Sequence, residues 1–217
     1  MNRLFAALAG LALLAAPALA ATCKDEVAAA FEKQRKTNSF RMVTNMVSAE
    51  GPVQMTVDYI LPNKMHQTIK ALTNPNPAET ILVFDRAWTN EGKGWTSAPP
   101  ELADQLSKEI SETVLEPPSK FIDYACLGRV AVDGKEYFAY RAQEDTREKI
   151  PGAPQADPPL RLLYVDPETG LPARNVAALK GREDKPFFKT VYAYPKDIKI
   201  EPPTDAAPGP RAAKPPR

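Results

Sequence analysis

Two stretches near the beginning of the chain alternate between apolar and polar side chains with a period of two residues. They cover residues 40–47 and 53–61, and Glu50-Gly51-Pro52 lies between them. This period is typical of a β-strand with one buried face, and a turn between two such runs predicts an antiparallel hairpin. The side chains expected to share one face of this hairpin are Met42, Met46, Met55, Val57 and Tyr59.

Strand patterns of similar length recur along most of the remaining chain, with Gly, Pro, Asn and Asp gathered in the turns. Asp133-Gly134, for example, favours a tight primed turn between two strands. The further predicted strands cover residues 64–72, 80–84, the segment at Trp88, 126–132, 136–141, 160–165, 171–179 and 187–194. About ten strands joined by short turns predict one antiparallel sheet.

Two segments show the helical spacing of apolar residues instead. Residues 24–36 place Val27 and Ala30 on one face, with acidic residues in the first turn and basic residues in the last, which complements the helix dipole. In residues 101–115 an apolar side chain recurs at every fourth position, between two Pro-Pro pairs. We therefore predict an amphipathic helix in each segment.

The order of the predicted elements defines the fold class. One helix, about five strands, a second helix and about five more strands predict an α+β fold. We expect a strongly curved antiparallel sheet, an unclosed β-barrel, with an N-terminal helix and a second helix covering its open side. Residues 21–201 are predicted to form this single domain. Residues 202–217 hold six prolines and no periodic apolar pattern, so we expect this tail to be disordered.

Residues 1–20 have the pattern of a cleavable signal peptide. Arg3 precedes an apolar run that ends in Ala18-Leu19-Ala20, the Ala-x-Ala pattern of a cleavage site. The alternative is a membrane anchor, but the apolar run contains Pro17 and is shorter than the roughly 20 helical residues that a span needs. The protein is therefore predicted to be exported and periplasmic.

The chain has two cysteines, Cys23 and Cys126, which we predict to form a disulfide. Exported proteins meet an oxidising compartment in which paired cysteines stay bonded, and two buried thiols are the alternative. Lipidation of Cys23 is disfavoured because Thr22, rather than Gly, Ala or Ser, precedes it. Closing a loop of about 100 residues stabilises a fold by about 4–5 kcal/mol.

Charge and composition exclude several classes of function. The 28 Lys and Arg residues fall to 27 without Arg3 of the leader, against 27 Asp and Glu, so no cationic surplus supports nucleic-acid binding. One histidine and two cysteines leave few metal ligands, and the chain contains no phosphate-binding loop or serine-hydrolase motif. We predict a protein that is not an enzyme, with no metal site and no cofactor.

Soft apolar side chains give the strongest indication of a site. Four of the five methionines lie on three consecutive predicted strands, and methionine is frequent where a surface accepts varied apolar partners. An ordinary core packed against the helices is the alternative interpretation, and it applies equally to the two tryptophans beside the Gly-rich turn at residues 90–94. The candidate ligand-binding residues are Met42, Met46, Met55, Val57, Tyr59, Trp88 and Trp95.

Several of these segments resemble one protein family. They are Phe40-Arg41-Met42, residues 59–65 (Tyr-Ile-Leu-Pro-Asn-Lys-Met), residues 81–90 with Trp-Thr-Asn, and residues 163–172 with Asp-Pro-Glu-Thr-Gly-Leu-Pro. Together they resemble the LolA-like periplasmic carriers, a superfamily that includes LolA, LolB, mycobacterial lipid-binding lipoproteins and RseB-type sensors. The resemblance implies an unclosed β-barrel whose concave apolar side holds acyl chains beneath the helices, with no catalytic residue.

The resemblance also implies two kinds of partner. One is a lipid, or the acyl chain of a lipoprotein, sheltered in the cavity, with only transient contact with a membrane. The alternative function is that of an RseB-type envelope sensor, in which the same sheet binds a protein partner.

Overall fold

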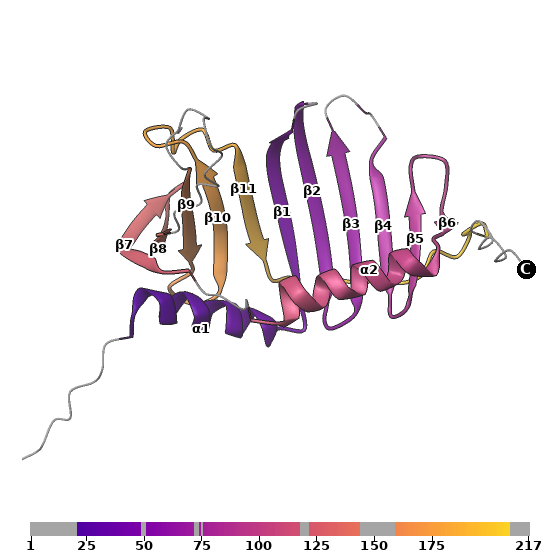
Figure 1. Ribbon diagram of the computed structural model, residues 1–217, viewed down its shortest axis with the longest axis horizontal. Coiled ribbons are helices and arrows are strands. Elements are labelled where there is room, and N and C mark those ends of the chain that lie inside the picture. Colours follow the sequence, from indigo (N-terminus) through magenta and orange to yellow (C-terminus); the bar gives the residue numbers. More distant parts are fainter. Residues whose placement is uncertain are drawn as a thin grey trace, which may run out of the picture.

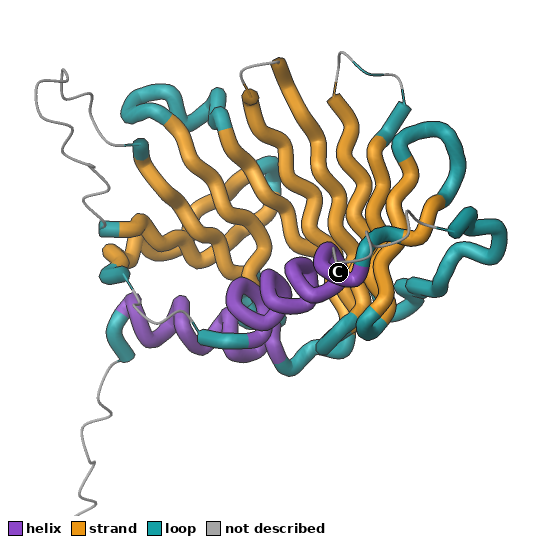
Figure 2. Tube along the Cα trace, turned by 45° about the vertical axis from the view of Figure 1, so that its right-hand side comes forward, coloured by secondary structure: helices purple, strands orange, loops and turns teal. Residues whose placement is uncertain are grey.

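Eleven strands form one antiparallel sheet in the computed structural model, which describes residues 21–48, 51–71, 74, 76–117, 122–143 and 159–208. The strands are β1 (Ser39–Ser48), β2 (Gly51–Ile60), β3 (Lys64–Ala71), β4 (Ala78–Val83), β5 (Arg86–Asn90), β6 (Thr96–Ser97), β7 (Tyr124–Val132), β8 (Lys135–Ala142), β9 (Leu160–Val165), β10 (Pro172–Ala178) and β11 (Phe188–Ala193). The sheet curves strongly (Figure 2). The predicted α+β fold with about ten antiparallel strands is thereby confirmed.

One long-range pairing holds the two halves of the sheet together. The strand order is β6-β5-β4-β3-β2-β1-β11-β10-β9-β8-β7, so every pair of described neighbours is consecutive in the sequence except β1 and β11 (Figure 1). The short β6 and the β7 strand are the two edges, and they do not pair with each other. The barrel is therefore unclosed, as predicted.

Helix α1 spans Cys23–Arg35. It begins with a capping box, in which the Thr22 hydroxyl accepts a hydrogen bond from the Asp25 N–H and the Asp25 carboxylate accepts one from the Thr22 N–H, both at 3.2 Å. Val27 and Ala30 are buried on its sheet-facing side. The observed helix agrees with the prediction to within one residue at each end.

Helix α2 spans Pro100–Ile110 and continues as a π-helix, η1, over Ser111–Leu115. Pro100 suits the first helical position because the N–H that proline lacks would have no helical partner there. The predicted helix over 101–115 is confirmed in extent, but its last turn has the wider π geometry, which is frequent at functional sites.

Both helices lie across the same side of the sheet, near the strand ends opposite the β1–β2 turn (Figures 1 and 2). We call this side the inner face and the opposite side the outer face. α1 contacts β7 and β10, whereas α2 contacts β4 and β5. α1 therefore lies across the half of the inner face that contains β7 and β10, and α2 lies across the half formed by β1 to β5 (Figure 1).

A disulfide joins Cys23 at the start of α1 to Cys126 in β7, with a Cα–Cα distance of 5.4 Å. The pairing predicted from the sequence is confirmed. The salt bridge between Lys24 and Asp123, 3.3 Å long, lies beside it. Both links fix the beginning of α1 to the edge strand of the sheet.

The structure differs from the predicted disorder of the tail over residues 202–208. Ala207 forms a parallel bridge to Thr96, its N–H donates to the Trp95 carbonyl at 2.9 Å, and its carbonyl accepts from Ser97 N–H at 2.9 Å. Ala206 packs against the apolar cluster of the outer face. The domain therefore extends past residue 201. This segment has no periodic pattern of apolar residues, and its structure comes from backbone pairing and burial against the rest of the domain.

Some predictions fall outside the described residues. The signal peptide over residues 1–20 and residues 209–217 of the tail belong to this group. In the described part of the chain, no helix has the length and apolarity needed to cross a membrane.

Candidate functional site

The inner face carries an apolar row that runs directly across five strands. Each residue of this row lies opposite the next one on the neighbouring strand, and Ala103 and Ile110 of α2 pack against the row. The row consists of Phe40, Tyr59, Met65, Leu82 and Ala87. This part of the face is a packed core, so the interpretation as core holds for the row beneath α2.

A cavity of about 520 Å³ lies beside this row, between the two helices. Its floor comes from β1, β2, β3 and β11, one wall from the end of α1 and the other from α2 and η1. We call it the interhelical cavity, and its lining consists of Phe31, Gln34, Arg35, Phe40, Met42, Met55, Val57, Tyr59, Met65, Gln67, Leu106, Glu109, Glu112, Thr113, Val114, Glu116 and Tyr192. Its volume lies within the range of about 300–1,000 Å³ of small-molecule sites.

The sheet contributes several apolar and deformable side chains to the cavity. Met42 lies opposite Val57 in the pairing of β1 with β2. Met55 precedes Val57 by two residues on β2, and Met65 lies opposite Tyr59 on β3, so the three methionines share the inner face. Three methionine thioethers thus line one space, and their unbranched side chains adapt to irregular apolar shapes. Such a lining accommodates flexible hydrocarbon better than it defines one rigid ligand.

The polar groups of the lining are mostly neutral. Tyr59 is 8% exposed and stacks on Phe40 with ring centroids 4.9 Å apart. Burial, with a further effect of the nearby Glu109 charge, raises the pKa of Tyr59. Burial likewise raises the pKa of Tyr192 to about 12. Both phenols are therefore protonated at neutral pH and can donate a hydrogen bond.

Other polar side chains of the lining are already paired within the protein. The Gln34 amide donates to the Tyr194 hydroxyl at 3.1 Å, and that hydroxyl donates to the Pro172 carbonyl at 2.7 Å. The Gln67 amide contacts the Met55 sulfur at 3.2 Å. These contacts hold the floor in place without adding charge to it.

Four charged side chains also line the cavity, and three of them, all except Glu109, have a partner nearby in the sequence. Arg35 of α1 forms a 2.8 Å salt bridge with Glu32, and Glu112 lies 3.7 Å from Lys108. Glu116 accepts a hydrogen bond from the Ser111 hydroxyl at 2.8 Å. The cavity thus combines apolar side chains with polar and charged ones, a combination that suits an amphiphile.

Four of the seven predicted ligand-binding residues line this cavity: Met42, Met55, Val57 and Tyr59. Sequence reasoning left Met65 and Tyr192 out of the site, although strand alternation places Met65 on the same face as Tyr59. The predicted site also lacked Leu106 and Val114 of the second helix. The apolar residue at every fourth position of this helix was the pattern that could have identified them.

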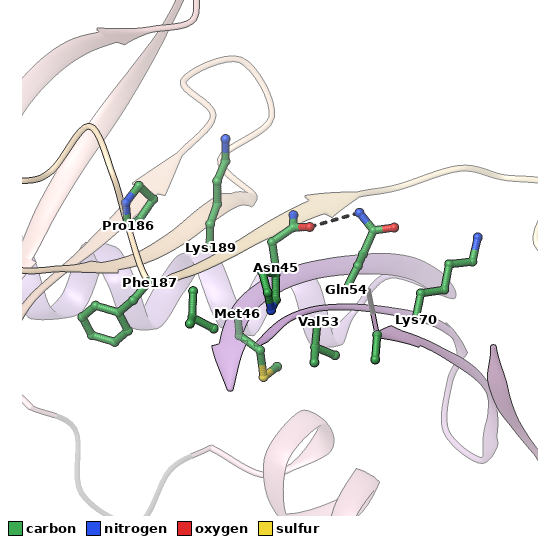
Figure 3. A pocket seen from close by; sticks show the side chains of 11 residues that line it. Asn45, Met46, Val53, Gln54, Lys70, Pro186, Phe187 and Lys189 are labelled. Carbon is green, nitrogen blue, oxygen red and sulfur yellow. Dashed lines mark hydrogen bonds between the residues drawn. The ribbon is translucent and has the colours of Figure 1, made fainter. Parts of the chain in front are cut away.

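Met46 lies apart from these residues although it shares their face. It lines a second cavity of about 580 Å³ at the strand ends near the β1–β2 turn, which we call the rim cavity. Figure 3 shows Met46 and Val53 on one side of the strands, with Lys70 and Lys189 extending from the other. Met46 lies two residues beyond Thr44 along β1, at the end of the strand that the helices do not cover.

The structure places Trp88 and Trp95 on the outer face, away from both cavities. Trp88 pairs with Ile81 across β4 and β5, whereas the inner face at this point carries Leu82 and Ala87. Trp88 is 3% exposed and packs in one cluster with Ile81, Val83 and Ile200, and Trp95 packs against this cluster. The two tryptophans are brought together, but as part of a core that the chain after β11 covers.

The remaining candidate chemistry is sparse in the described part of the chain. No group of three or more His, Cys, Asp and Glu residues there is placed to hold a metal ion. His66, the single histidine of the sequence, lies on the outer face and contacts the Glu79 carboxylate at 3.1 Å. It does not line the interhelical cavity.

The sequence matches no protein-family model, and no curated protein is significantly similar to it. Solved structures with the same arrangement do exist. LprF from Mycobacterium bovis has a TM-score of 0.51 and 14% identity, covering 83% of this chain and 96% of LprF. The Mycobacterium tuberculosis lipoprotein LppX has a TM-score of 0.51 and 10% identity, covering 82% of this chain and 97% of LppX.

The chain shares the fold of these two mycobacterial structures. A LolA superfamily protein from Nitrosomonas europaea also matches, over 86% of this chain and 96% of its own, at a TM-score of 0.31 and 12% identity. The two mycobacterial structures carry the assignment. At these identities the likeness concerns the fold alone, and in this chain the curved sheet and the two helices enclose the interhelical cavity.

Proposed function

We propose that the protein is a periplasmic, non-catalytic binding protein that shelters an acyl chain in the interhelical cavity. The observation that carries the proposal is a cavity of about 520 Å³ between the two helices in which Met42, Met55 and Met65 lie together. Each methylene that such a space removes from water contributes about 0.8 kcal/mol to binding. The ligand is a free lipid or the acyl chain of a lipidated protein.

Polar groups in the lining support an amphiphilic ligand rather than a pure hydrocarbon. Tyr59 lines the cavity, and its hydroxyl is protonated at neutral pH. A ligand oxygen, such as that of a carboxyl or ester group, can accept a hydrogen bond from this hydroxyl. The apolar floor then holds the chain that follows.

The periplasmic part of the proposal has separate support. The disulfide between Cys23 and Cys126 is typical of an oxidising compartment. The pattern of residues 1–20 predicts a cleavable signal peptide.

Solvent extraction of the purified exported protein, followed by mass spectrometry, tests the proposal. The expected result is a lipid or fatty acid recovered in stoichiometric amount. Lipid-free protein that also fails to bind added fatty acids would contradict it, and selective capture of one envelope protein under the same conditions would favour the sensor function instead.

Adjacent substitutions on β2 provide a matched pair. Met55→Glu introduces a carboxylate into the cavity, and Gln54→Glu introduces the same charge next to it on the exposed outer face. Because a charge is costly in apolar surroundings, Met55→Glu should weaken binding of a fluorescent fatty acid by about tenfold or more. Gln54→Glu should bind like the wild type, and equal affinities of the two variants would contradict the site.

A further inference from the structure

Exposed apolar side chains gather at one end of the molecule. Five large hydrophobic residues of the described chain are exposed, and three of them lie at the strand ends opposite the helices: Val47 (65% exposed), Leu179 (51%) and Phe187 (39%). The other two, Phe84 and Leu127, lie elsewhere. Single exposed apolar residues are ordinary, but a group at one end marks an interaction surface.

Backbone contacts hold these three side chains together. The Val47 N–H donates to the Phe187 carbonyl at 3.0 Å, and the Phe187 N–H donates to the Ala177 carbonyl at 3.1 Å. Val47 and Phe187 both line the rim cavity. Leu179 follows Ala177 by two residues, at the beginning of the β10–β11 loop.

The β10–β11 loop is folded rather than extended. Leu179 accepts a backbone hydrogen bond from Arg182 at 2.9 Å, and the Arg182 carbonyl accepts one from Lys185 at 3.0 Å. The Glu183 carboxylate accepts a hydrogen bond from the Gly181 N–H at 2.9 Å. The loop therefore presents Leu179 and its neighbouring cations from a defined turn.

Cations surround this apolar group. The described residues of the loop and the adjoining strand ends include Lys70, Lys180, Arg182, Lys185 and Lys189. The acids among them are Glu183 and Asp184, and no salt bridge in the described part of the chain neutralises any of the five cations. Because the chain as a whole has nearly equal numbers of cations and anions, this surplus is local.

We propose that this end of the molecule, the rim surface, docks the protein on an anionic lipid bilayer. We define the rim surface as Val47, Leu179 and Phe187 together with the five surrounding cations. Exposed apolar side chains enter the boundary between headgroups and acyl chains, while cations bind the anionic headgroups around them. The combination of both at one end favours a bilayer over a protein partner, and the inference does not depend on what occupies the interhelical cavity.

Sedimentation with lipid vesicles tests the proposal on the exported protein. It should bind vesicles of equal parts phosphatidylglycerol and phosphatidylcholine, and bind far less to phosphatidylcholine alone. Binding to neither, equal binding to both, or capture of a protein through the rim surface without any vesicle binding would overturn the proposal.

Matched variants locate the contact. Leu179→Ser/Phe187→Ser should lower vesicle binding by about tenfold or more, whereas Phe84→Ser, at a side chain that is 56% exposed on the turn after β4, should bind like the wild type. Equal binding of the apolar rim variant and Phe84→Ser would overturn the location.

A second pair isolates the electrostatic part. Lys180→Gln/Lys185→Gln should weaken binding about 25-fold, at about fivefold for each cation. Lys196→Gln/Lys199→Gln removes two exposed lysines beyond β11, on the helix side, and should leave binding unchanged. If both pairs lose binding equally, the attraction is general and the rim surface is not the docking site.

A labelled variant keeps the proposal testable even where the serine variant fails to fold. Leu179→Cys carrying an environment-sensitive fluorophore should shift its emission to the blue on phosphatidylglycerol vesicles. The same label at Phe84→Cys should not shift. An unshifted label at residue 179 on vesicles that bind the protein would contradict the proposal.

Discussion

The hydroxyls of Thr44 and Thr190 are hydrogen-bonded to each other at 2.8 Å in the buried middle of the sheet. The two side chains are 1% and 2% exposed, respectively. They lie opposite each other where β1 pairs with β11, the pairing that joins the N-terminal and C-terminal halves of the sheet. Each hydroxyl is therefore the other's partner at the junction on which the fold depends.

This geometry predicts a non-additive pair of substitutions. Thr44→Val leaves the Thr190 hydroxyl buried without its partner and should lower the free energy of unfolding by about 1–3 kcal/mol. The double variant Thr44→Val/Thr190→Val removes both polar groups and should be less destabilised than the sum of the single variants. Urea unfolding of all three proteins measures the coupling, and strictly additive losses would show that the two hydroxyls act independently.

Loss of the disulfide should strongly destabilise the protein. Cys23 and Cys126 are 103 residues apart in the sequence, and a closed loop of this length restricts the unfolded chain by about 4–5 kcal/mol. Cys23→Ser/Cys126→Ser should lower the urea midpoint accordingly. An unchanged free energy of unfolding would mean that the bond contributes little to the fold.

Tryptophan fluorescence should report on the outer-face core. Both tryptophans of the chain belong to the cluster that Ile200 helps to cover, and Ile200 is 3% exposed. Ile200→Ala should cost about 2–5 kcal/mol and shift the emission of the folded protein to the red. Val47→Ala, at a side chain 65% exposed, is the control and should do neither. A red shift in the control alone would contradict this assignment.

Asp166 should make stability depend on acid pH. Burial alone would raise its pKa, but hydrogen bonds from the Lys135 ammonium at 2.6 Å and from the N–H groups of Thr169 and Glu168 outweigh burial and lower the pKa below its ordinary value of 3.8. Because the folded state binds a proton less readily than the unfolded state, the stabilisation is complete above pH 3.8 and is lost as pH falls through the lowered pKa.

Asp166→Asn should therefore be less stable than the wild type at pH 7 and should lose less stability on acidification. Thermal unfolding across the acid range measures both effects. Asp104→Asn, at an exposed position of α2, is the control and should follow the wild type. A variant at Asp166 with the wild-type acid profile would contradict the role of this carboxylate.

Local patterns predicted most of the fold. The alternation on β1 and β2 fixed which side chains share a face, and Asp133-Gly134 formed the expected turn, with φ of 52° and 78°. The geometry at the end of the second helix was not predicted. The apolar spacing continues unchanged to Val114, whereas the backbone changes to π geometry at Ser111. Patterns within one element determine local structure, whereas small changes in helical winding leave no clear trace in them.

What the sequence did not determine about the site depends on relationships between elements. Trp88 was a candidate ligand-binding residue with an ordinary core as the alternative, and the register across the β4–β5 turn pairs it with Ile81 on the outer face. A shift of one residue in such a register moves a side chain to the opposite face, and the sequence of a turn does not determine that register. The order of residues 202–208 was missed for a related reason, because it comes from pairing with Thr96 and its neighbours, more than 100 positions earlier.

Methyl NMR of the exported protein, labelled at its methionines, tests the central claim most directly. Met42, Met55 and Met65 line the interhelical cavity, and Met46 lines the rim cavity. Titration with a long-chain fatty acid should shift the first three signals together, saturate at one ligand per protein, and leave Met46 nearly unmoved. Three unmoved cavity signals, or a shift confined to Met46, would contradict the binding of an acyl chain between the helices.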